Sequence, residues 1–163
     1  MKKLIYFIAA AMMVVLTGCG SKRSQAYYDQ KSLVLSANYD GSYVIRTTVR
    51  SRNSALAFSD AQRKAVEEVI FDGVKSATNG VADLKPLCFD MNAREKHEDY
   101  FQAFFSEEGA WKQFVSLRDK RSGSTEYTRT TAQMVQTVTV TVQRADLKRR
   151  LQADGIIPME GRY

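Results

Sequence analysis

The chain has 163 residues, a formal net charge of +6 at pH 7, 44% hydrophobic residues and 10% aromatic residues. These proportions are typical of a globular protein and exclude a disordered or fibrous chain. One domain of this size can build a core without disulfides or metals. The positive charge is mild and interleaved with acidic residues, so it does not indicate a nucleic-acid partner.

The N-terminal segment has the layout of a secretory signal peptide. Lys2 and Lys3 form a basic start, and an apolar run follows over residues 4–16. This run is shorter than the about 20 residues that a membrane-spanning helix needs. It ends in Leu-Thr-Gly before Cys19, the arrangement at which a bacterial lipoprotein is cut and its cysteine is acylated. We expect residues 1–18 to be a lipoprotein signal peptide and Cys19 to carry lipid. The alternative is an ordinary signal peptide with an incidental cysteine.

Residues 19–41 are expected to hold the lipidated cysteine and a tether, and residues 42–163 a single domain. The segment begins polar, whereas the apolar residues 33–35 suggest that its second half starts to pack on the domain. Asp40 and Gly41 predict a turn. If Cys19 is acylated, Cys88 has no partner in the chain. We expect Cys88 to be buried; a reactive or intermolecular thiol is the alternative.

The first strand and the first helix are predicted from their periodicity. Over residues 42–51, apolar and polar side chains alternate with the period of two that a strand with one wet face requires. A capping box at residues 59–62 predicts a helix that runs to about Phe71, with Gly73 as its end. Its buried stripe is expected to consist of Ala61, Ala65, Val66, Val69 and Ile70.

The second half of the chain contains further elements. Residues 74–91 are expected to be irregular, and a capping box at residues 92–95 predicts a second helix. A strand is predicted around residues 113–119, a longer one over residues 134–143, and a final helix over residues 145–154. The element order β-α-α-β-β-α predicts an α+β fold, with a small antiparallel sheet of about three strands and helices packed on one face.

Catalytic and metal-binding motifs are not found. The chain has one histidine, His97, and lacks the usual nucleophile elbow, phosphate-binding loop and paired-cysteine motifs. Glu95, Glu98 and Asp99 lie at a predicted helix start, where negative charge is stabilising. We therefore expect no enzyme activity, no cofactor and no metal site.

Two groups of residues are candidates for a binding surface. The first is an aromatic cluster of the second helix and its continuation: Tyr100, Phe101, Phe104, Phe105 and Trp111. Its spacing suits core packing, and the alternative is a partner surface or a ligand-lined cavity. The second is a basic stripe on the polar side of the first strand: Arg46, Arg50 and Arg52. A solvated charged face explains such a stripe, and contact with lipid phosphates or acidic envelope polymers is the functional alternative.

Two stretches resemble a known group of proteins. They are the strand at 43–46 with the alanine-spaced helix at 54–73, and the strand and helix at 138–147 that continue to Gly155–Ile157. Together they resemble small uncharacterised outer-membrane lipoproteins of Bacteroidetes-type bacteria. More distantly they resemble LPP-type lipoproteins and the N-terminal domain of the flagellar assembly T protein. The resemblance implies an α+β envelope domain and no catalytic residues. In that group, acidic residues after the lipidated cysteine accompany surface export, whereas Lys22 and Arg23 are basic.

These observations predict a non-enzymatic lipoprotein that the lipid on Cys19 anchors to the periplasmic face of the outer membrane. Its domain is expected to act as an adaptor that binds another envelope protein. The alternative is a small-molecule or lipid carrier in which the aromatic cluster lines a pocket. An envelope hydrolase ranks last, because the chain offers no activated nucleophile and no metal site.

Overall fold

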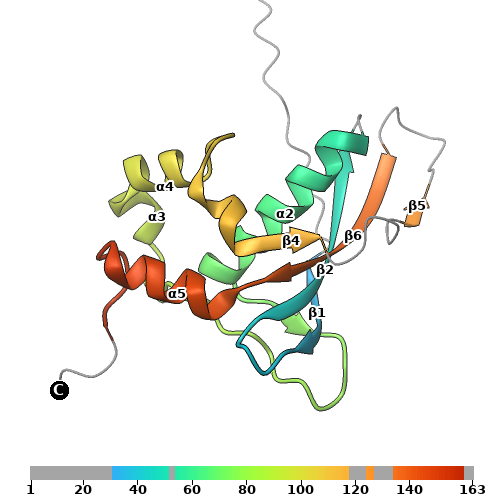
Figure 1. Cartoon of the computed structure of the whole chain (residues 1–163), viewed down its shortest axis with the longest axis horizontal. Coiled ribbons are helices and arrows are strands. Elements are labelled where there is room, and N and C mark those ends of the chain that lie inside the picture. Colours follow the sequence, from blue (N-terminus) through green and yellow to red (C-terminus); the bar gives the residue numbers. More distant parts are fainter. Residues whose placement is uncertain (1–30, 52–53, 118–123, 127–133, 160–163) are drawn as a thin grey trace, which may run out of the picture.

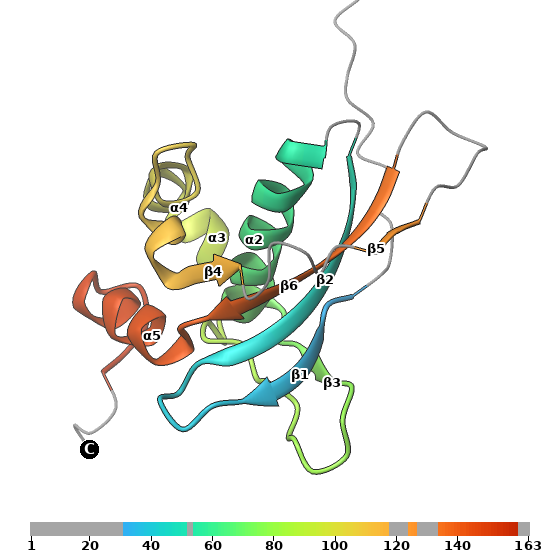
Figure 2. The same cartoon turned by 45° about the vertical axis from the view of Figure 1, so that its right-hand side comes forward.

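The computed structural model describes residues 31–51, 54–117, 124–126 and 134–159. It has an α+β architecture in which one curved sheet carries the helices on one side (Figures 1 and 2). The strands are β1 (Leu33–Ala37), β2 (Tyr43–Ser51), β3 (Lys75–Ser76), β4 (Val115–Leu117), β5 (Ser124–Glu126) and β6 (Met134–Val142). The helices are α2 (Ser54–Phe71), α3 (Ala93–Lys96), α4 (Glu98–Phe104), the 3-10 helix η2 (Ala110–Phe114) and α5 (Arg144–Ala153).

The sheet is larger than the sequence predicts, and it is mixed rather than antiparallel. Its strand order is β3-β1-β2-β6-β4, with β5 also paired to β6. β1 and β3 are parallel, and the other pairs are antiparallel. The expected sheet of about three antiparallel strands and the expected element order are therefore incomplete. The two-residue β3 and the three-residue β5 are too short to show a period of two.

The sheet also includes the end of the segment expected to be a tether. β1 pairs with β2 through registers such as Val34 with Ile45, and the side chain of Val34 is fully buried. Residues 33–37 therefore belong to the folded domain, whose sheet starts before Ser42. A β-bulge between Val34 and Ser36 shifts the register and interrupts the alternation along β1.

The centre of the sheet is the long antiparallel pair of β2 and β6. Its register runs from Tyr43 opposite Val142 to Ser51 opposite Met134. Ile45 on β2 and Val138, Val140 and Val142 on β6 are buried beneath α2, while Arg46 is exposed on the other face. The alternation predicted for both strands is confirmed at these positions.

Helix α2 supplies most of the layer over the sheet. Its predicted stripe is fully buried at Ala61, Ala65, Val66, Val69 and Ile70. The helix starts at Ser54 and not at the capping box, so Ser59 lies inside it. A capping motif is a local signal, and here the helix extends through it because Ala57 packs in the core.

The end of α2 is determined by Gly73. This residue has a φ of +75°, and its N–H donates to the carbonyl of Glu68 over 2.7 Å. A Cβ at this position would lie 2.5 Å from the carbonyl oxygen of Leu84. The predicted helix end is therefore confirmed, and it requires a residue without a side chain.

The second predicted helix is two short ones. α3 begins after Asn92, as its capping box predicts, but Asn92 makes no side-chain capping bond. His97 interrupts the helical conformation, and α4 begins at Glu98. The final helix matches its prediction within one residue at each end, and Gly155 follows it with a φ of +75°.

Candidate functional site

The aromatic cluster lies in the core and not on the surface. Phe101, Phe104, Phe105 and Trp111 are between 2% and 7% exposed. Phe101 contacts Phe71 of α2 with ring centroids 4.8 Å apart, and the indole Nε1–H of Trp111 donates to the carbonyl of Ser106 over 3.0 Å. The core-packing interpretation is therefore confirmed for these residues, and the alternative of a partner or ligand surface is corrected. The 3.6-residue period is the same whether an apolar helix face meets a partner or its own sheet.

Tyr100 is the half-buried member of this cluster, and it joins two helices. Its hydroxyl donates to Oδ2 of Asp154 over 2.7 Å, and Nε of Arg150 donates to the same oxygen over 2.6 Å. Burial, followed by the hydrogen bond to Asp154, raises the pKa of Tyr100. The hydrogen bonds from Tyr100 and then Arg150 lower the pKa of Asp154. The hydrogen bond between Tyr100 and Asp154 therefore links α4 to the C-terminal end of α5.

A small pocket of about 80 Å³ lies between the β1–β2 turn and the start of α5. It is lined by Asp40, Ser42, Gln143, Ala145 and Asp146, none of which belongs to the aromatic cluster. Hydrogen bonds from Ser42, through its hydroxyl at 2.7 Å and its N–H at 2.9 Å, lower the pKa of Asp40. The carrier alternative predicted an aromatic cavity, and this pocket does not provide one.

The groups considered for catalysis and metal binding are dispersed. Glu95, Glu98 and Asp99 are exposed. In the part of the chain that the structure describes, histidine, cysteine and carboxylate side chains form no group of three that could hold a metal ion. Cys88 is buried as expected, and burial, followed by the charge of Asp90, raises its thiol pKa to about 11.

The basic stripe lies on the face of the sheet that carries no helix. Arg46 is exposed and Arg50 is half-buried on β2, whereas Arg52 lies outside the described residues. Residues opposite one another in an antiparallel pair share a face, so Arg46 lies beside Thr139 and Thr48 beside Thr137. The hydroxyls of Thr48 and Thr137 are 3.2 Å apart. We call this the open face; its members are Leu33, Arg46, Thr48, Arg50, Thr137, Thr139 and Thr141, and Val44, opposite Thr141, shares the face but is buried.

The view in Figure 2 shows why this face is open. The labelled helices all lie on one side of β1, β2 and β6, and no helix of the described ranges crosses the other side. The alternating pattern places threonine and arginine there because α2 takes up the apolar face. One-sided antiparallel sheets commonly have this wet face, which is accessible to solvent or to a partner.

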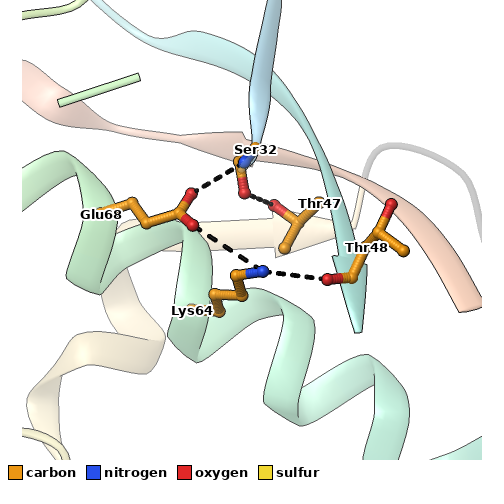
Figure 3. A network of polar contacts seen from close by, with 5 residues as sticks. All are labelled: Ser32, Thr47, Thr48, Lys64 and Glu68. Carbon is orange, nitrogen blue, oxygen red and sulfur yellow. Dashed lines mark hydrogen bonds and ion pairs between the residues drawn. The ribbon is translucent and has the colours of Figure 1, made fainter. Parts of the chain in front are cut away.

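A polar network at the start of the domain was not predicted. The hydroxyl of Ser32 donates to Oγ1 of Thr47 over 2.9 Å, and the N–H of Ser32 donates to Oε2 of Glu68 over 3.3 Å. Nζ of Lys64 lies 3.8 Å from Oε1 of Glu68 and donates to the carbonyl of Thr48 over 3.0 Å. Figure 3 shows these groups converging from the chain before β1, from β2 and from α2. The residues lie far apart in sequence, so no local pattern indicates this network.

The Ser32–Thr47 end of the network is nearly free of solvent, whereas the side chains of Lys64 and Glu68 are partly exposed. Ser32 and Thr47 are 1% and 0% exposed. Burial raises the pKa of Glu68, and the hydrogen bond from Ser32 and the charge of Lys64 partly oppose this effect. Because Thr47 and Glu68 both bind Ser32, the network fixes the point at which the preceding chain enters the domain.

No family model, curated protein or solved structure matches the chain. Among the described residues, no helix combines the length and the apolar character needed to cross a membrane.

Proposed function

We propose that this protein is a non-enzymatic, lipid-anchored envelope protein that binds another envelope protein through the open face of its sheet. The observation that carries the proposal is the one-sided sheet. Helices cover one face, while the other presents Arg46 and a row of threonines from two long strands. Hydroxyl groups and guanidinium groups suit a polar or anionic protein surface.

The anchor in this proposal is the acyl-modified Cys19. Residues 20–31 separate it from Ser32 and could extend to at most about 40 Å. Such a tether keeps the domain next to the membrane, where a high local concentration compensates for modest affinity. Lys22 and Arg23 after the cysteine favour the periplasmic face of the outer membrane, by analogy with the resembling lipoproteins.

Site-specific photo-crosslinking in the native bacterium tests the proposal. We expect a photoreactive residue at Thr139, on the open face, to give one discrete crosslinked protein. The same residue at Gln102, exposed on α4, should give none. Arg46→Glu should lower the yield at Thr139 severalfold because it reverses the charge of the surface, whereas Lys112→Glu on η2 should not.

The membrane part is tested with Cys19→Ala. This variant should leave the membrane fraction and should lose the crosslink at Thr139. Crosslinks at Gln102 but not at Thr139 would contradict the assignment of the open face. Unchanged membrane association of Cys19→Ala would contradict the anchor.

A further inference from the structure

Two large apolar side chains lie fully outside the core, close together in sequence. Phe89 is 76% exposed and Met91 is 98% exposed. They belong to the segment 87–92 between β3 and α3, which we call the Phe89 loop. Exposed apolar side chains are common one at a time, but two such residues on one short loop suggest an apolar partner.

The fold imposes this exposure. On one side of the loop, the N–H groups of Leu87 and Cys88 donate to the carbonyls of Val69 and Ile70 over 3.1 and 2.8 Å. Leu87 and Cys88 are themselves buried, so their side chains occupy the core side of the loop. Phe89 follows them on the solvent side of the loop.

The C-terminal side of the loop also forms hydrogen bonds. The N–H of Ala93, a buried residue, donates to the carbonyl of Asp90 over 3.1 Å. The N–H of Asn92 donates to Oδ1 of Asp90 over 3.0 Å. Met91 lies between these contacts and points outward. The loop is therefore a built turn with a fixed apolar tip.

The charge at the tip is balanced. Asp90, between the two apolar residues, forms an ion pair with Lys96. Lys85 and Arg94 flank the loop and are exposed, Arg94 in an ion pair with Glu67, and the exposed carboxylates Glu95, Glu98 and Asp99 follow on α3 and α4. At the tip itself, the one carboxylate between Phe89 and Met91 is thus neutralised by Lys96, which reduces its repulsion of phosphate headgroups.

The loop and the residue that precedes β1 are both attached to the C-terminal part of α2. Ser32 donates to Glu68, and the loop attaches to Val69 and Ile70, the next two residues of α2. These three residues span less than one turn of the helix, which has 3.6 residues per turn. The chain that leads to Cys19 and the apolar tip are thus held by the same turn of α2.

We propose that the Phe89 loop rests on the lipid surface to which Cys19 anchors the chain, with Phe89 and Met91 in the boundary between headgroups and acyl chains. This inference rests on the proposed lipid anchor. It also orients the domain. α3, which follows the loop, lies on the helix side of the sheet, so lipid contact there leaves the open face available to a protein partner (Figure 2).

The test uses the full-length acylated chain in vesicles of phosphatidylethanolamine and phosphatidylglycerol that contain brominated acyl chains, which quench tryptophan fluorescence on contact. Phe89→Trp reports on the loop. Tyr39→Trp is the control, because Tyr39 is an aromatic residue at least as exposed as Phe89, in the β1–β2 turn. The native Trp111 is buried, and its signal is subtracted with the unsubstituted protein.

We expect a blue shift and loss of fluorescence for Phe89→Trp and neither change for Tyr39→Trp. A chain that floats with the vesicles but leaves Phe89→Trp unquenched would overturn the loop contact and leave the anchor intact. Equal quenching of both variants would overturn it as well, since the contact would not be specific to the loop. A chain that carries no acyl group by mass spectrometry and does not float would overturn the anchor, and the loop contact with it.

Discussion

The hydroxyls of Ser32 and Thr47 share a hydrogen bond of 2.9 Å in a region almost without solvent, fifteen positions apart in the chain. This bond joins the first residue of the domain to the central strand, and Glu68 holds the same residue from the helix layer. Contacts from both the sheet and the helix layer therefore fix the position of Ser32, where the chain enters the domain.

Thr47→Val should destabilise the domain by about 1–2 kcal/mol, because it leaves the buried hydroxyl of Ser32 without its acceptor. Valine keeps the shape and the strand propensity, so the loss reflects the hydrogen bond. Urea unfolding measures it. Thr48→Val, on the half-exposed open face, is the control and should change the stability by less than about 0.5 kcal/mol. Equal effects of the two variants would contradict the role of the buried bond.

Glu68 should make the stability depend on pH. Burial raises its pKa in the folded protein, so folding favours the protonated carboxyl. The stability of the wild type relative to Glu68→Gln should fall as pH rises from the ordinary glutamate pKa through the raised one, and should then stay constant. Chemical denaturation of both proteins at a series of pH values measures this difference. A difference that grows in favour of the wild type over that window would contradict the burial effect.

Phe104→Ala should cost about 3–5 kcal/mol, because Phe104 is 4% exposed and packs against Phe105 and Phe114. Phe89→Ala removes the same side chain from an exposed site and should cost less than about 0.5 kcal/mol. Thermal or urea unfolding compares the two. If Phe104→Ala kept full stability and lost only partner binding, the aromatic cluster would be a surface after all.

Gly73→Ala should destabilise the domain more than Gly80→Ala. Both glycines have positive φ, at +75° and +94°, so each substitution carries a strain of about 1–2 kcal/mol. Only at Gly73 would the new Cβ also meet the carbonyl oxygen of Leu84, whereas nothing lies within 4 Å at Gly80. Denaturation midpoints of the two variants test this order. Equal losses would show that the clash is relieved by movement of the segment around Leu84.

Much of the fold could be predicted because its main elements carry their own period. The alternation of Ile45 and Thr47 with Arg46 identifies β2, and the spacing of Ala61, Ala65 and Val69 identifies the buried side of α2. Of the two candidate surfaces, Arg46 lies on the open face as expected, and the aromatic residues lie in the core, as their helical spacing indicates; only the alternative of an aromatic surface is wrong. The lipid on Cys19 stays a prediction, since residue 19 lies outside the described residues.

The sequence by itself determined the elements whose hydrophobic period spans several turns or residues, since that period depends only on neighbouring positions. It also supplied the linear motif before Cys19. Only the tertiary structure decided which side of α4 meets α2, that β3 adds a parallel edge beside β1, and that Ser32, Thr47 and Glu68 meet. These outcomes depend on which distant surfaces pack together, and burial between layers is a property of the whole chain rather than of any one segment.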